Sequence, residues 1–166
     1  MNNAQTSFFI FNDKVYINDG INYLVYDGSL RKVVEDAFIP TTTINRSPNG
    51  GGTVYQDINL LQPKRINTFC ADGTSKDYYL DATEINSVDK VYVNDTLTTA
   101  YKVSLLLGKV TFNTAPTAPG MSGTANVKIE FSKSTAGYTD RIEKCTISQV
   151  FDNRVFFTKM EHQKQK

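Results

Sequence analysis

The sequence predicts an all-β protein, in which a small antiparallel β-sandwich is inserted between two hairpin or meander segments that pack as one sheet. Short runs of alternating apolar and polar residues are separated by Asn, Asp, Gly and Pro throughout the chain. The 166 residues include 9 tyrosines and 10 phenylalanines but no tryptophan, and with many β-branched residues this composition favours strands. Apolar residues make up 40% of the chain, which is enough for the cores of one or two small domains.

The first segment, residues 8–28, has the pattern of a three-stranded meander. Asn12-Asp13 and Asn18-Asp19-Gly20 are turn signals, because Asn, Asp and Gly accept the positive φ of tight turns. Residues 29–37 fit either a further strand or one to two helical turns, and Pro40 prevents a long helix.

Residues 45–53 contain three consecutive glycines and are predicted to be the most flexible stretch of the chain. A phosphate-binding loop would need Gly-Lys-Ser/Thr at the start of a helix, and neither the lysine nor a helical pattern follows. We therefore expect residues 1–66 to form a β-meander followed by a mobile, Gly-rich segment.

Residues 67–133 are predicted to form the sandwich, with residues 64–69 as its leading strand. The alternation is clearest in the last strand, where Val127, Ile129 and Phe131 share one face. Asn94-Asp95 and the segment around Gly108 mark hairpins, and residues 114–124 form a loop that crosses between strands.

Residues 134–160 are predicted to form a C-terminal hairpin that packs with the N-terminal meander. Residues 151–157 repeat the order found in residues 11–17: aromatic, two turn residues, a base, Val, aromatic, apolar. This internal repeat indicates that both ends belong to the same kind of sheet. Residues 161–166 are polar and are predicted to be a disordered tail.

No catalytic, cofactor or metal site is expected. His162 lies in the polar tail, where a general base would lack an orienting partner. Cys70 and Cys145 are expected to be small buried apolar residues rather than a disulfide or a zinc site. Three carboxylates could serve as catalytic acids by residue type, but nothing else in the sequence supports that role: Asp72, Asp77 and Asp81.

The net charge of +1 is spread over interspersed charges of both signs, which argues against a nucleic-acid partner. No apolar run approaches the roughly 20 residues of a membrane span, and the N-terminus lacks the basic region of a signal peptide. We therefore expect a chain that is made in a cytoplasm and has no membrane partner.

Several motifs of the central segment together resemble a small Ig-like β-sandwich module of bacteriophage tail and other virion proteins. They are Ala71-Asp72-Gly73-Thr74, Tyr78-Tyr79-Leu80, Val91-Tyr92-Val93-Asn94-Asp95, Tyr101-Lys102-Val103, Gly108-Lys109-Val110-Thr111-Phe112 with Ala115-Pro116, and Val127-Lys128-Ile129-Glu130-Phe131. The chain departs from the module at Asp95, where Gly is usual, and at Leu107, where a polar turn residue is usual.

The flanking segments resemble structural proteins of phages of Gram-positive hosts, in which they belong to a longer, β-propeller-like body. This resemblance implies that the chain is a fragment or a truncated reading frame, whose open sheet edges need a partner. It further implies a non-enzymatic role in tail or head–tail assembly, through contacts with other virion subunits or copies of the same chain. The expected location is the virion, after synthesis in the cytoplasm of the bacterial host.

The alternative is a tail-associated receptor or carbohydrate-binding module that recognises a host-surface glycan; a hydrolase remnant is a third and weaker hypothesis. The candidate contact residues are Arg46, Tyr78, Tyr92 and Tyr101, together with the loops 45–53 and 114–124. Exposed tyrosines can stack on a sugar ring, but aromatic residues are also ordinary cross-strand pairs in sheets.

Overall fold

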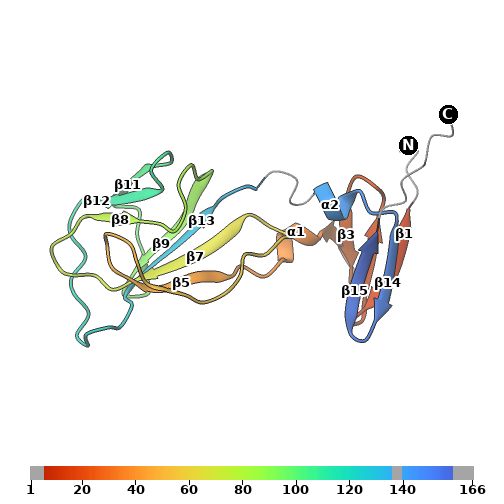
Figure 1. Cartoon of the computed structure of the whole chain (residues 1–166), viewed down its shortest axis with the longest axis horizontal. Helices are drawn as coiled ribbons and strands as arrows, with labels where there is room; N and C mark the ends of the chain where they lie inside the picture. The colour runs from red at the N-terminus through yellow and green to blue at the C-terminus, as the bar shows by residue number, and fades with distance from the viewer. Residues whose placement is uncertain (1–5, 136–139, 159–166) are drawn as a thin grey trace. The chain divides into compact units, whose positions relative to one another are not determined.

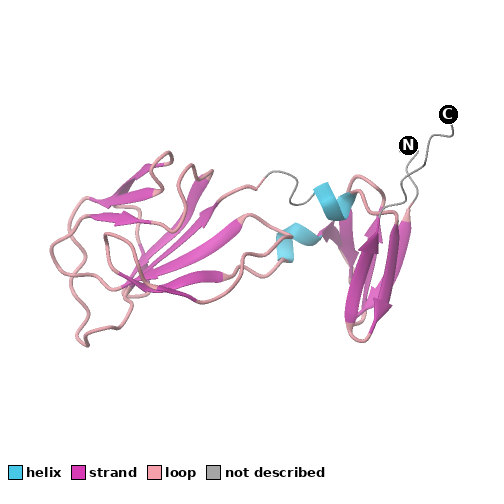
Figure 2. Ribbon diagram, viewed as in Figure 1, coloured by secondary structure: helices cyan, strands magenta, loops and turns pink. Residues whose placement is uncertain are grey.

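The computed structural model describes residues 6–135 and 140–158. These residues form fifteen strands and two four-residue helices, which confirms the all-β class (Figures 1 and 2). In the described part of the chain, neither helix is long and apolar enough to span a membrane. The described residues divide into two compact units: a flank unit (residues 6–37, 60–62 and 140–158) and a sandwich unit (residues 38–59 and 63–135).

The flank unit begins with a four-stranded antiparallel meander in which each strand pairs with the next one along the chain. Its strands are β1 (Ser7–Phe11), β2 (Lys14–Asn18), β3 (Tyr23–Tyr26) and β4 (Leu30–Lys32). The sequence predicted three strands and left residues 29–37 open between strand and helix. Both are present, because β4 is followed directly by the single helical turn α1 (Val33–Asp36).

Two-residue turns close the first and the last hairpin of this unit, as the internal repeat predicted. Asn12 and Asp13 have φ of 47° and 59°, and Asp152 and Asn153 have φ of 48° and 55°. Two successive positive φ values match the twist of the flanking strands. The loop after β2 is different: four residues are closed by the Asp19 carboxylate, which accepts hydrogen bonds from the Ile21 and Asn22 amides at 2.9 and 2.6 Å.

The C-terminal part of the flank unit consists of α2 (Asp140–Glu143) and a hairpin of β14 (Ile147–Phe151) and β15 (Arg154–Thr158). Strand β14 lies beside β1 (Figure 1), where the Ser7 and Ser148 hydroxyls are 3.5 Å apart. The buried Asn18 side chain donates a hydrogen bond to the Ile142 carbonyl at 2.5 Å. The first and last described strands thus belong to one unit.

The sandwich unit has two facing sheets. The larger sheet has the order β10 (Thr96–Leu97), β9 (Ser87–Val93), β13 (Val127–Ser132), β7 (Lys64–Phe69), β5 (Thr41–Arg46), β6 (Thr53–Val54). The smaller sheet has the order β11 (Tyr101–Ser104), β12 (Lys109–Phe112), β8 (Asp77–Tyr79). Val127, Ile129 and Phe131 of β13 all enter the core between the sheets, as their alternation predicted.

The sandwich unit begins at residue 38, whereas the sequence predicted a boundary at residue 67. The reason is strand β5, which pairs with β7 in parallel and so draws the preceding segment into the larger sheet. The buried Asn67 amide joins the two strands to the start of the next loop. It donates to the Thr42 hydroxyl at 2.9 Å and accepts a hydrogen bond from the Asp81 amide at 2.9 Å.

Gly108 closes the hairpin between β11 and β12 and provides a test of this fold. Its φ is +58°, and a Cβ atom there would lie 1.8 Å from the Ala82 carbonyl oxygen. We predict that Gly108→Ala lowers the free energy of unfolding by about 2 kcal/mol or more, because the backbone must shift to relieve this overlap. Urea denaturation followed by circular dichroism measures the change.

Gly120→Ala is the matched control, because a Cβ atom at Gly120 would have no neighbour within 4 Å and the φ of this residue is not positive. This variant is expected to change the free energy of unfolding by less than about 0.5 kcal/mol. Equal effects of the two substitutions would contradict the conformation of the β11–β12 hairpin described above.

Candidate interaction surface

The meander carries a row of apolar side chains on the side that faces away from the C-terminal hairpin. Cross-strand pairing places Ile10, Val15, Tyr26 and Leu30 in one row across the four strands. It places Phe8, Ile17, Leu24 and Lys32 in the next row on the same side. We call the seven apolar residues the outer face: Phe8, Ile10, Val15, Ile17, Leu24, Tyr26 and Leu30.

The outer face is strongly exposed at its two edges. Phe8 and Ile10 in β1 are 73% and 68% exposed, and Tyr26 and Leu30 are 48% and 60% exposed. On the opposite side of the same strand Phe9 is buried. The meander is therefore apolar on both of its faces, which is unusual for an antiparallel sheet with one face in water.

The opposite side, which we call the inner face, is covered by aromatic packing. The rings of Phe9 and Tyr16 are stacked with their centroids 5.1 Å apart. Phe157 of β15 meets Phe9 edge-on at 5.8 Å and Tyr23 edge-on at 5.4 Å. Burial raises the pKa of the Tyr23 hydroxyl above its usual range, with a smaller contribution from neighbouring Tyr16.

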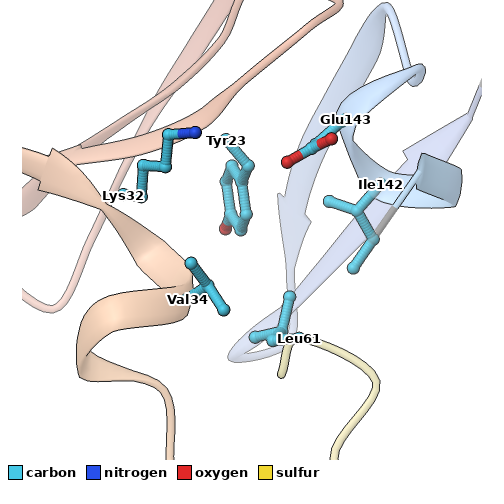
Figure 3. A pocket seen from close by; sticks show the side chains of 6 residues that line it. All are labelled: Tyr23, Lys32, Val34, Leu61, Ile142 and Glu143. Atoms are coloured by element: carbon cyan, nitrogen blue, oxygen red, sulfur yellow. The ribbon is translucent and has the colours of Figure 1, made fainter. Parts of the chain in front are cut away.

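Two cavities lie along this inner face. The smaller one encloses about 20 Å³, roughly the space for one water molecule, and is lined by Tyr23, Lys32, Val34, Leu61, Ile142 and Glu143 (Figure 3). The larger one is an open groove of about 500 Å³ with mostly apolar lining, which includes five aromatic residues: Phe9, Phe11, Tyr16, Tyr23 and Phe157. The charged residues on this groove, Lys14 and Asp36, form ion pairs with Asp27 and Arg31 respectively.

Two of the candidate contact residues predicted from the sequence are buried in the sandwich unit. Tyr78 is fully buried in the core, where Phe69 and Phe112 meet its ring edge-on. Arg46 is also buried, and its guanidinium donates two hydrogen bonds to the Tyr79 carbonyl at 3.2 and 3.3 Å. Burial lowers the pKa of Arg46. These two residues hold the sandwich together and are not available to a partner.

The other two candidates, Tyr92 and Tyr101, are partly exposed but lie in different sheets. The Lys128 ammonium stands 4.4 Å from the centroid of the Tyr92 ring. Tyr101 lies in the smaller sheet and packs edge-on against Phe112 at 6.4 Å. The structure therefore does not bring the tyrosines together as one platform.

The two predicted contact loops are well-defined structures. In the first, Ser47 and Gly50 exchange backbone hydrogen bonds at 3.0 and 3.1 Å, and a Cβ atom on Gly52 would overlap the Arg46 side chain. The prediction that residues 45–53 are the most flexible stretch of the chain stays a prediction, because these contacts describe one conformation and not its mobility. The second loop, residues 114–124, borders a groove of about 380 Å³, lined in part by Tyr92, Asn94, Asn126 and Lys128.

The three carboxylates named from the sequence have separate structural partners. Asp72 accepts hydrogen bonds from the Thr74 and Ser75 amides and the Ser75 hydroxyl, which lower the pKa of its carboxyl well below the usual range. The Asp77 carboxylate accepts hydrogen bonds from the Lys109 ammonium at 2.9 Å and from the Thr111 hydroxyl at 2.6 Å. The bond from Lys109 is the main cause that lowers the pKa of Asp77. Asp81 accepts from the Thr42 hydroxyl at 2.6 Å.

Cys70 and Cys145 are free thiols, each half-buried rather than fully buried, and burial raises the pKa of both. His162 and the predicted tail lie outside the described residues. In the described part of the chain no cluster of three or more His, Cys, Asp or Glu side chains is arranged to hold a metal ion.

The sequence prediction missed the outer face. The signal was present in Phe8-Phe9-Ile10-Phe11, where four apolar residues follow one another without alternation. A strand of this kind has apolar side chains on both sides of its sheet.

Comparison with known proteins does not identify the chain: no protein-family model, no curated protein and no solved structure gives a significant match.

The buried hydroxyl of Tyr78 gives a test of its role in the core. This hydroxyl has no hydrogen-bond partner among the described residues. We predict that Tyr78→Phe raises the free energy of unfolding at pH 7 by about 1 kcal/mol, because it removes an unsatisfied polar group and keeps the ring. Urea denaturation measures the change, and a loss of more than about 1 kcal/mol would show that the hydroxyl makes a stabilising contact.

The same hydroxyl predicts how stability depends on alkaline pH. Burial, with a smaller effect of the Asp72 charge, raises the pKa of Tyr78 from 10.0 to about 12. Above pH 10 the unfolded chain loses the Tyr78 hydroxyl proton while the folded chain keeps it. The protonated Tyr78 hydroxyl therefore contributes fully to the free energy of unfolding below pH 10, and this contribution falls as the pH rises toward 12. The slope is about 1.4 kcal/mol per pH unit.

Urea denaturation is measured at several pH values from 9 to 11. Over this range the free energy of unfolding is therefore expected to fall more for the native sequence than for Tyr78→Phe. All other groups are the same in both proteins, so their contributions cancel in the difference. Parallel pH profiles for the two proteins would contradict the burial of this hydroxyl.

Proposed function

We propose that this chain is a non-enzymatic structural protein of a bacteriophage particle, which assembles through protein–protein contacts of the outer face. The observation that carries this proposal is the meander sheet with apolar side chains on both faces. A contiguous apolar surface of this kind marks an interaction site in soluble proteins.

The phage setting is supported by the sequence motifs of residues 71–131, which resemble an Ig-like module of virion proteins. The all-β structure agrees with such a module, because those motifs contribute strands to both of the facing sheets. In this proposal the chain is made in the host cytoplasm and works in the virion, in the tail or at the head–tail connection. The sandwich unit is its rigid part, and the loops 45–53 and 114–124 provide further contacts.

A second candidate function is recognition of a host-surface glycan in the groove beside residues 114–124. The observation in its favour is the combination of a half-exposed tyrosine with two amides and an ammonium around one groove: Tyr92, Asn94, Asn126 and Lys128. The Asn126 side chain already donates to the Asn94 side chain and the Thr117 carbonyl and accepts from the Ala71 amide. The groups suited to a sugar hydroxyl are therefore the Asn94 amide nitrogen and the Lys128 ammonium. Lys128 already covers part of the Tyr92 ring, so a sugar would have to displace it or bind at the ring edge.

Mass spectrometry of purified particles of the phage that encodes the chain tests the first function. The chain is expected among the particle proteins, and Ile10→Lys is expected to reduce its incorporation at least about 10-fold, because a buried lysine without a partner is unfavourable. Leu97→Lys is the matched control, since Leu97 is 58% exposed in the edge strand β10 of the sandwich unit.

Absence of the chain from the particles would overturn the proposed function. Equal incorporation of the Ile10→Lys and Leu97→Lys variants would exclude the outer face as the contact surface. If the chain is absent from the particles but binds host cells, and Tyr92→Ala abolishes this binding, the glycan-binding function is favoured instead.

A further inference from the structure

We propose that the outer face of the meander binds the outer face of a second copy of this chain, with the two sheets packed face to face. This inference rests on the proposed function and names the partner at its contact surface. The argument comes from the area of the face, its lack of charge and the sizes of its side chains.

The area of the outer face is close to what one partner of a stable complex buries. Its four most exposed side chains, Phe8, Ile10, Tyr26 and Leu30, present roughly 500 Å² of apolar surface at their observed exposures. Val15, Ile17 and Leu24 are half-buried and extend this surface between the edges. A standard interface buries about 800 Å² on each side, so the whole face is of the right order.

The outer face also lacks the charges by which a different partner would be selected. Lys14 and Arg31 belong to the inner side of the sheet by their pairing with Phe11 and Val25. Lys32 ends the second row, but its side chain lines the small cavity beside Tyr23 (Figure 3). Apart from Lys32 at its margin, the face is apolar, and such a face is complementary to another of the same kind. The same face on a second copy meets that requirement by symmetry.

The side-chain sizes favour a twofold axis parallel to the strands. Such an axis reverses the order of the strands across the interface, so that β1 of one copy lies over β4 of the other. In the row that runs from Ile10 to Leu30, it places Val15 of one copy against Tyr26 of the other, a small side chain against a large one. The same operation places Ile10 against Leu30 at both edges of the interface. In the second row it places Phe8 against the position of Lys32, whose side chain lines the small cavity beside Tyr23.

Sedimentation of the full chain tests this arrangement. The native sequence is expected to be a dimer at about 100 µM. Ile10→Lys and Leu30→Glu are each expected to weaken self-association roughly 100-fold, because each substitution buries a charge against an apolar residue. An equal mixture of the two variants is expected to recover a dimer with one copy of each, because Lys at position 10 then faces Glu at position 30.

Leu97→Glu is the control, because Leu97 in the sandwich unit is as exposed as Leu30 and lies outside the outer face. It is expected to leave the dimer unchanged. A monomeric native chain at this concentration overturns the proposal, as does a Leu97→Glu variant that dissociates like Leu30→Glu. A mixture that stays monomeric although both variants keep the native circular dichroism spectrum overturns the strand-parallel axis.

These outcomes are distinct from those for the proposed function. A native chain that is monomeric in solution but present in purified particles would reject the second copy as partner and leave the structural role in place. A chain that dimerises but is absent from the particles would reject the structural role in the particle and leave the second copy as the partner of the outer face.

Discussion

The edge-on contacts of Phe157 with Phe9 and Tyr23 decide which side of the meander sheet is covered. Phe157 comes from the last strand of the described chain and the other two rings from the first and third strands. Edge-to-face aromatic pairs of this kind contribute about 1 kcal/mol each beyond the area that they bury. They hold the C-terminal hairpin on the inner face, and the Asn18 side chain adds a hydrogen bond to the Ile142 carbonyl. Among the described residues of this unit, no element covers the outer face.

The sandwich unit shows how the same chain arranges a strand when only one face meets the core. In β13, Val127, Ile129 and Phe131 enter the core, whereas Lys128 and Glu130 lie on the other side near opposite charges or an aromatic ring. Strand β1 does not follow this pattern, since Phe8 and Ile10 replace the expected polar residues. About 500 Å² of apolar surface corresponds to roughly 12 kcal/mol if it is removed from water, which is comparable with the net stability of a whole domain. Polar residues at positions 8 and 10 would avoid this exposure without disturbing the inner packing, so the apolar residues indicate a contact.

The sequence was sufficient where structure depends on neighbours along the chain. The Asn12-Asp13, Asn94-Asp95 and Asp152-Asn153 turns all have two positive φ values, so Asn and Asp here adopt the conformation that such turns often give to Gly. Long-range pairing was not predictable in the same way. Strand β5 joins β7 in parallel through partners about 25 residues apart, and no local pattern specifies that choice. Arg46 and Tyr78 were named as candidate contact residues, with cross-strand pairing as the alternative for the tyrosine. Their burial depends on the Tyr79 carbonyl and on the aromatic neighbours of Tyr78, which only the folded chain brings close.

An open sheet can associate through its edges as well as through its faces, and the structure of the meander disfavours the edge. Strand β4 at one edge has only three residues, and the chain turns into α1 directly after it. Its central residue, Arg31, is held by ion pairs with Asp27 and Asp36, and a short, charged edge strand is a poor template for another strand. The other edge strand, β1, already has β14 beside it. Both edges are thus occupied or protected, whereas the outer face is neither. Association of this unit is therefore expected through side chains of the face, where packing sets the geometry, and not through extension of the backbone hydrogen-bond ladder.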